Sequence, residues 1–97
     1  MVSEEKGIIR LLGKKYTYNM LRSLEKGPRR FKAMSDVCAV EKMRSQRLRE
    51  LESLNLIKVR AKRMGRRAVS IYSLSEKGKK ALKLAESIKK LEYENSQ

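Results

Sequence analysis

Apolar residues recur at helical spacing in the first part of the chain, and glycines mark where the helices end. Over residues 17–26 the inward-facing positions recur about once per helical turn, which predicts a helix there. The pair Gly27–Pro28 ends this helix, because glycine favours helix C-termini and proline does not continue them. Upstream, the apolar residues at positions 8–12 predict a shorter helix that ends at Gly13.

Two helical segments are expected after the proline. Arg29, Arg30 and Lys32 are expected to open a short helix whose apolar face includes Phe31. A longer helix is predicted over residues 41–54, since at about 100° per residue its leucines gather on one side and pack inward. The opposite side is polar and free for a partner, and it consists of Lys42, Ser45, Gln46, Arg49 and Ser53.

The period of the pattern then changes from helical to alternating. Apolar and basic residues alternate over 57–62, and apolar and polar residues alternate over 69–74, which is typical of half-buried strands. With a turn at Met64–Gly65, these strands predict a β-hairpin. Ser75 then caps a last helix that runs to about Tyr93. The apolar stripe of that helix consists of Ala81, Leu84, Ala85, Ile88 and Leu91.

This order of elements is that of a winged helix-turn-helix. The expected fold class is mainly α with a small β-hairpin (α+β), in one domain over residues 1–97. The wing spans about 56–74 and the C-terminal helix about 75–93. The apolar stripe of that helix either covers the core of its own domain or pairs with its copy in a second subunit. Because the stripe is long for so small a domain, we favour a homodimer through the N- and C-terminal helices.

The charge of the chain indicates the kind of partner that it binds. The formal net charge is +14, and the pI is about 10.3. Residues 56–74 carry six basic residues and no acidic one. Protection of an edge strand needs only one or two cations, so a polyanion such as nucleic acid explains the excess better. The alternative is a surface that is basic only for solubility.

The residue types that are absent exclude several classes of protein. There is no histidine and only one cysteine, Cys38, so a disulfide framework, a cysteine-based zinc site and the usual general base are all missing. We therefore expect neither an enzyme nor a cofactor. No signal peptide or run of about 20 apolar residues is present, which favours a cytoplasmic protein. We interpret Cys38 as a small core residue, with a redox sensor as the alternative.

The polar side of the 41–54 helix is the candidate surface for base contacts. A helix fits the major groove of duplex DNA, where arginine pairs with guanine and glutamine with adenine. The alternative is an ordinary solvated helix face. Elsewhere, cations are expected to contact phosphates or the minor groove. The candidate DNA-binding residues are Lys42, Ser45, Gln46 and Arg49 on the helix, Arg60, Lys62, Arg63, Arg66 and Arg67 in the wing, and Arg30 and Lys32 before the helix.

Two further arginines of this helix, Arg44 and Arg47, lie nearer the apolar stripe. Because a buried unpaired cation is costly, we expect their stems to lie along the core and their charged heads to extend outward. The alternative is that they pair with Glu50 or Glu52.

The order and spacing of several segments resemble HxlR-type transcriptional regulators. The similar segments are LGKKYT at 12–17, QRLRELE at 46–52 and YSLSEKG at 72–78. This resemblance implies a homodimer bound to operator DNA, with terminal helices at the interface. The chain departs from the family in having Cys38-Ala39-Val40-Glu41 where Gly-Ile-Ser is usual before the recognition helix. It also lacks the N-terminal cysteine of redox-sensing members.

The function that these features predict is sequence-specific binding of double-stranded DNA by a prokaryotic transcription regulator. One alternative is a nonspecific architectural DNA-binding protein, for which a charge of +14 is also suitable. Another is a winged-helix protein-interaction module within a larger machine, in which the basic hairpin would be dispensable.

Overall fold

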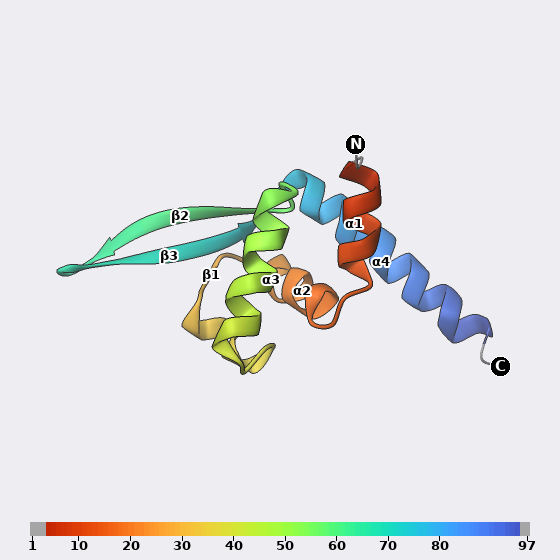
Figure 1. The fold of residues 1–97 in the computed structure, drawn as a ribbon, viewed down its shortest axis with the longest axis horizontal. Helices are drawn as coiled ribbons and strands as arrows, with labels where there is room; N and C mark the ends of the chain where they lie inside the picture. The colour runs from red at the N-terminus through yellow and green to blue at the C-terminus, as the bar shows by residue number, and fades with distance from the viewer. Residues whose placement is uncertain (1–3, 96–97) are drawn as a thin grey trace.

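The computed structural model of the chain describes residues 4–95. Within this range, three helices and two short segments precede a long β-hairpin, and a long helix ends the chain (Figure 1). The elements are α1 (Glu4–Leu12), α2 (Thr17–Glu25), β1 (Arg29–Arg30), a 3₁₀ helix η1 (Lys32–Asp36), α3 (Glu41–Ser53), β2 (Ile57–Met64), β3 (Arg67–Leu74) and α4 (Glu76–Asn95).

The core is aliphatic and lies between the helices and the base of the hairpin. The apolar stripe predicted for α2 is buried there, together with the leucines of α3. Burying one such side chain contributes roughly 1.5–3 kcal/mol, so the stripe accounts for much of the stability of α2. The largest fully buried apolar side chains are Met20, Leu21, Met34, Leu48, Leu51, Leu56 and Leu82.

A left-handed residue turns the chain from α3 into the hairpin. Asn55 has a φ of 62°, and its backbone N–H donates to the carbonyl of Glu52 at 2.9 Å. The N–H of Leu56 donates to the carbonyl of Leu51 at 3.0 Å. These two bonds form a Schellman motif, which satisfies carbonyls at the end of α3. The motif places Leu56 and Ile57 in the core at the start of β2.

The sheet has three antiparallel strands in the order β1-β3-β2. Arg29 and Arg30 form β1, which pairs with Tyr72 and Ile71 of β3. The expectation that these two arginines open the short helix was therefore wrong, because hydrogen bonds to a strand about 40 positions later hold them extended. In the hairpin, the register runs from Ile57↔Leu74 to Met64↔Arg67.

The last helix begins as the sequence predicted. The hydroxyl of Ser75 accepts a hydrogen bond from the backbone N–H of Gly78 at 2.9 Å and donates one to the carbonyl of Asn55 at 2.6 Å. The cap therefore also ties α4 to the turn that follows α3, and both elements are held at the base of the hairpin.

The second half of α4 extends away from the body of the molecule, on the side opposite the hairpin (Figure 1). Among the residues of its predicted stripe, Ala81 and Ala85 are buried. Leu84, Ile88 and Leu91 are 63%, 53% and 58% exposed. The stripe therefore packs against the domain core in the first part of α4 and is exposed in the second part. None of the helices within residues 4–95 is both long and apolar enough to cross a membrane.

Replacing Gly78 with alanine is expected to destabilise the domain by about 1–3 kcal/mol, as overpacked sites do. An added Cβ would lie 2.0 Å from the carbonyl oxygen of Leu56 and 2.9 Å from a methyl group of Leu74. The first neighbour is backbone and cannot rotate away. Urea denaturation measures the change, with Gly13→Ala as the control, because its Cβ meets nothing closer than 3.6 Å. Equal stability of the two variants would contradict the tight approach of α4 to Leu56.

Candidate nucleic-acid interface

The helix α3 presents its polar side to solvent, as the periodicity predicted. Lys42, Gln46 and Arg49 are exposed, and Ser45 is partly exposed. On the other side of the helix, Leu48 and Leu51 are fully buried. Packing of these leucines fixes the rotation of α3 about its axis, so the four polar side chains face outward together.

The N-terminus of α3 is held by Arg44 instead of a side-chain cap. Val40 occupies the capping position and makes no side-chain hydrogen bond to the helix. The guanidinium of Arg44 turns back to three carbonyls: Nε donates to Cys38 at 2.8 Å, Nη2 to Ala39 at 3.1 Å and Nη1 to Phe31 at 3.3 Å. It also lies over the ring of Phe31, 4.6 Å from the centroid.

This arrangement corrects the expectation for Arg44. Its side chain is only 3% exposed, and its charged head points into the protein and not outward. Hydrogen bonds to carbonyls and the face of an aromatic ring compensate for lost hydration, which is why the burial is tolerated. Arg44 thus ties the turn before α3 to the start of η1.

Arg47 is also buried, and here the alternative of pairing with Glu50 is confirmed. Nη1 of Arg47 forms an ion pair with Oε1 of Glu50, and Nε donates to the carbonyl of Lys15 at 3.1 Å. Lys14 Nζ lies 2.7 Å from Oε2 of the same carboxylate. Burial raises the pKa of Glu50, but the hydrogen bond from Lys14 and the charges of Arg47 and Lys14 outweigh it, so the pKa is lowered. The carboxylate therefore links α3 to the connection between α1 and α2.

A basic groove lies between α3, the end of β1 and the edge of β3. It has a volume of about 470 Å³ and no acidic residue in its lining. The groove brings together four of the candidate DNA-binding residues that are distant in sequence. These are Arg30, Lys32, Ser45 and Arg67, and the remaining lining consists of Phe31, Ala68, Val69, Ser70 and Tyr72.

The two faces of the hairpin differ in what they contact. Successive side chains of a strand point to opposite faces, so one face carries residues 57, 59, 61 and 63 with their partners 74, 72, 70 and 68. We call this the inner face, because Ile57 is buried and Leu74 and Tyr72 pack against the core. Burial raises the pKa of Tyr72, and the charge of Glu52 on α3 raises it further, which agrees with an inner face turned toward α3.

The outer face carries most of the basic side chains of the wing. Lys58, Arg60 and Lys62 of β2 lie on it, and the register places Arg67 there too. Arg63 belongs to the inner face. Arg66 lies in the turn after Gly65, whose φ is 65°. The wing cations form one run in the sequence, and the fold divides them between two faces and the tip.

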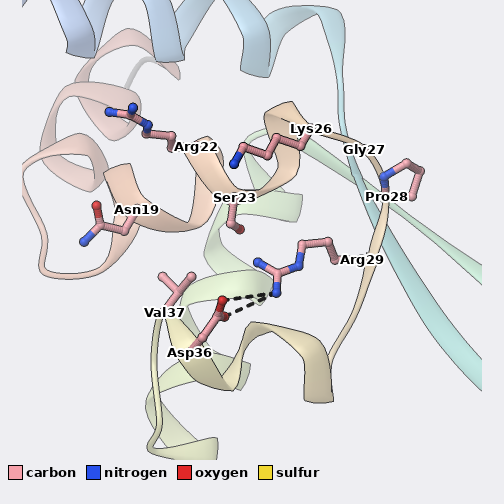
Figure 2. A pocket seen from close by; sticks show the side chains of 9 residues that line it. All are labelled: Asn19, Arg22, Ser23, Lys26, Gly27, Pro28, Arg29, Asp36 and Val37. Carbon is pink, nitrogen blue, oxygen red and sulfur yellow. Dashed lines mark hydrogen bonds and ion pairs between the residues drawn. The ribbon is translucent and has the colours of Figure 1, made fainter.

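A second hollow, of about 660 Å³, lies beside α2 and η1 (Figure 2). Asn19 and Arg22 line it from α2, and Lys26 lines it directly after the end of that helix. Arg29 reaches into it and donates to the carboxylate of Asp36 at 3.3 Å and to the carbonyl of Ala33. Arg29 therefore holds η1 against β1. This contact was not predicted from the sequence, because it depends on the extended conformation of β1.

Cys38 lies in the core, as interpreted from the sequence. It is 1% exposed, and its sulfur lies 3.7 Å from the carbonyl oxygen of Val40. Its position directly before α3 shows that the segment Cys38-Ala39-Val40 supplies packing and carbonyl groups for Arg44 in place of a hydroxyl cap.

Comparisons with known proteins find a matching family model and similar solved structures. The model of the family described as HxlR-like helix-turn-helix matches residues 11–97. The reduced form of the transcriptional regulator YodB from B. subtilis has a TM-score of 0.76 and 26% identity, over 92% of this chain and 88% of that one. The reduced redox regulator HypR has a TM-score of 0.78 and 21% identity, over 98% and 95%.

A structure with bound DNA is also similar. PadR from Bacillus subtilis, in complex with operator DNA, has a TM-score of 0.63 and 20% identity, over 68% of this chain and 43% of that one. No curated protein sequence matches this chain significantly. The solved structures and the element order confirm the expected α+β winged-helix fold.

Proposed function

Because the chain belongs to the HxlR-like helix-turn-helix family of DNA-binding transcription regulators, we propose that it binds particular base sequences in duplex DNA and regulates transcription there. The observation that carries this proposal is the basic groove. The groove joins the outward side of α3 to the edge of the wing without any acidic residue in its lining. Such a surface offers base-edge contacts and phosphate contacts side by side.

The contacts are divided between two kinds of residue. Lys42, Ser45, Gln46 and Arg49 project from α3 and contact base edges in the major groove. The cations of the groove and the wing contact phosphates or the adjacent minor groove, and they carry no base preference. This second set consists of Arg30, Lys32, Arg60, Lys62, Arg63, Arg66 and Arg67.

The uncovered stripe of α4 supports a homodimer. Leu84, Ile88 and Leu91 form a row at helical spacing, and a contiguous exposed apolar patch is typical of a protein–protein interface. Ile9 of α1 is exposed as well. A twofold dimer through α1 and α4 would present two copies of α3 to the two halves of a palindromic operator.

The remaining parts of the proposal follow from this role. The protein acts in the cytoplasm of a prokaryotic cell, where the chromosome is accessible. It catalyses no reaction and needs no cofactor, since binding alone regulates transcription. A nonspecific architectural protein is the second candidate, and the net charge of +14 favours it to the same degree.

Selection of bound fragments from random duplex DNA tests the proposal. A regulator retains a preference of about 10³-fold or more for one sequence over random DNA, whereas an architectural protein shows only a steep dependence on salt. Recovery of no common sequence would favour the architectural alternative. A protein-interaction module would bind no duplex in dilute buffer.

Two alanine variants then separate the two kinds of contact. Gln46→Ala is expected to relax the preference at one base position by about 1–3 kcal/mol. Arg66→Ala is expected to weaken binding about equally on all sequences and to reduce the salt slope by about 1. Titrations on the selected site, on its single-base variants and on random DNA measure both effects. Equal loss on every sequence for Gln46→Ala would contradict the placement of α3 in the major groove.

A further inference from the structure

A polar face of α2 lines the hollow beside η1. The members of this face lie three or four positions apart, so they are neighbours on one side of the helix. They are Asn19, Arg22, Ser23 and, directly after the helix, Lys26. Arg29 of β1 and Asp36 of η1 complete the polar part of the lining. The volume of about 660 Å³ lies within the range of roughly 300–1,000 Å³ that is typical of small-molecule sites.

The hollow has an excess of positive charge. Its lining contains three cations, Arg22, Lys26 and Arg29. Asp36 is the one acidic residue in that lining, so three positive charges and one negative charge leave +2. The guanidinium of Arg22 is turned toward Tyr18, to whose hydroxyl Nη1 donates at 3.2 Å. The ammonium of Lys26 points into the space between α2 and η1, and within residues 4–95 no hydrogen bond or ion pair engages it (Figure 2).

Arg29 has donors that the described part of the protein does not use. Its hydrogen bonds to Ala33 and Asp36 all come from Nη2, and within residues 4–95 neither Nε nor Nη1 has a partner. Each edge of a guanidinium that can hold two oxygens of one oxyanion includes Nη2, together with either Nε or Nη1. An oxyanion that replaced Asp36 at Nη2 would therefore gain a second hydrogen bond from Arg29.

The contact between Arg29 and Asp36 is weak enough to be exchanged. Both carboxylate oxygens lie 3.3 Å from the same nitrogen, and the side chain of Asp36 is 65% exposed. Exposed ion pairs of this kind contribute little to stability, because water competes for both partners.

The hollow is separate from the basic groove. The two share no lining residue, and none of the residues that line the hollow belongs to the proposed DNA-binding set. Arg29 and Arg30 are successive residues of β1, so their side chains point to opposite sides of the strand. Arg30 lines the basic groove and Arg29 lines the hollow.

We propose that this hollow binds the phosphate group of a small phosphorylated molecule, which Lys26 and Arg29 hold. At neutral pH a phosphate monoester carries about 1.5 to 2 negative charges and three strong acceptor oxygens, which matches the charge of the hollow. A single carboxylate would neutralise only half of that charge. The exposed amide of Asn19 is available to the rest of the molecule. Because the phosphate replaces Asp36 at Arg29, binding loosens the attachment of η1 to β1. This inference does not depend on the DNA binding proposed above.

Titration of the full chain with inorganic phosphate and with glycerol phosphate tests the inference. Chloride is adjusted to keep the ionic strength constant, and two-dimensional amide NMR spectra locate the bound anion. Saturable shifts are expected for Gly27 and Arg29, which line the hollow, and for Asp36, which loses its partner.

Two substitutions are expected to change the affinity for phosphate in opposite directions. Lys26→Gln weakens binding by about 10-fold, because a charge-assisted hydrogen bond is lost. Asp36→Asn strengthens binding by about 3-fold, because the competitor for Arg29 loses its charge. The matched controls are Lys83→Gln and Glu92→Gln, at exposed positions of α4 outside the hollow. Each control is expected to change the affinity by less than about 2-fold, since distant exposed charges are screened.

Shifts centred on Arg30, Ser45 and Arg67 would overturn the inference, because phosphate would then only follow the basic groove. Equal losses of phosphate affinity for Lys26→Gln and Lys83→Gln would overturn it, as would weaker binding by Asp36→Asn. Failure of glycerol phosphate to bind where inorganic phosphate does would refute a phosphorylated molecule as the ligand. In a duplex titration, Lys26→Gln is expected to match the unmodified protein. A loss of duplex affinity as large as that of Arg66→Ala would assign the hollow to the DNA surface instead.

Discussion

Replacing Ile88 with glutamate is expected to convert the proposed dimer into a monomer and to weaken binding to a two-half-site operator by roughly 10²–10⁴-fold. Ile88 lies in the middle of the uncovered row on α4, between Leu84 and Leu91. In a twofold interface, each change occurs twice, so two carboxylates would be buried against apolar surface. Once the dimer dissociates, the second half-site is no longer bound at a high effective concentration.

Two measurements on the same samples check this result. Sedimentation analysis gives the mass, and titrations on a palindromic site and on an isolated half-site give the affinities. The half-site affinity is expected to change little, because Ile88 belongs to the second half of α4, and that half extends away from the hairpin (Figure 1). Lys90→Glu is the control, since Lys90 is exposed and lies off the apolar row. An Ile88→Glu variant with unchanged mass and affinity would rule out α4 as the dimer interface.

Replacing Arg44 with methionine is expected to lower the free energy of unfolding by about 3 kcal/mol and to weaken DNA binding. Three carbonyls lose their donor, and a buried group left unsatisfied costs about 1–3 kcal/mol. The turn of Cys38 and Ala39 would no longer be tied to Phe31, so the start of α3 would lose its fixed position. Arg44→Lys is expected to recover part of the stability, because one ammonium group reaches fewer of the three carbonyls.

The control for Arg44 is Arg49→Met, the same substitution on the exposed side of α3. Its expected change in the free energy of unfolding is within about 0.5 kcal/mol, since Arg49 is exposed on the surface of α3. Its DNA affinity is expected to fall, because the proposed role of Arg49 is a direct contact with the duplex. Urea denaturation and DNA titration of both variants distinguish positioning from contact. Equal stability of Arg44→Met and the unmodified protein would refute the role assigned to Arg44.

Much of the fold could be predicted from the local pattern of apolar and polar residues. The apolar stripes of α2 and α3, the alternation in β2 and β3 and the serine cap of α4 are each visible in a window of a few residues. The family resemblance found in three such segments is confirmed by the match over residues 11–97. These features depend on the periods of helices and strands, which local sequence expresses directly.

The contacts that shape the candidate interface could not be predicted from the local sequence. Arg29 and Arg30 form a strand because β3 is present to pair with them, and no local signal announces that pairing. Arg44 is buried because carbonyls from two separate segments converge on its guanidinium. Considered within α3 alone, the charged head of Arg44 would be most stable in water, but the neighbouring turn supplies carbonyl acceptors that the helix sequence does not reveal.

By itself, the sequence determined the kinds and order of the main elements, the outward polar side of α3 and the excess of cations in the wing. Only the tertiary structure decided which of those cations share a groove with α3 and which lie outside it. The alternation of β2 separates its residues into two sets, but the burial of Ile57 in the core is what makes one set inner and the other outer. Packing of this kind joins residues far apart in the chain, so it is a property of the whole fold and not of any one segment.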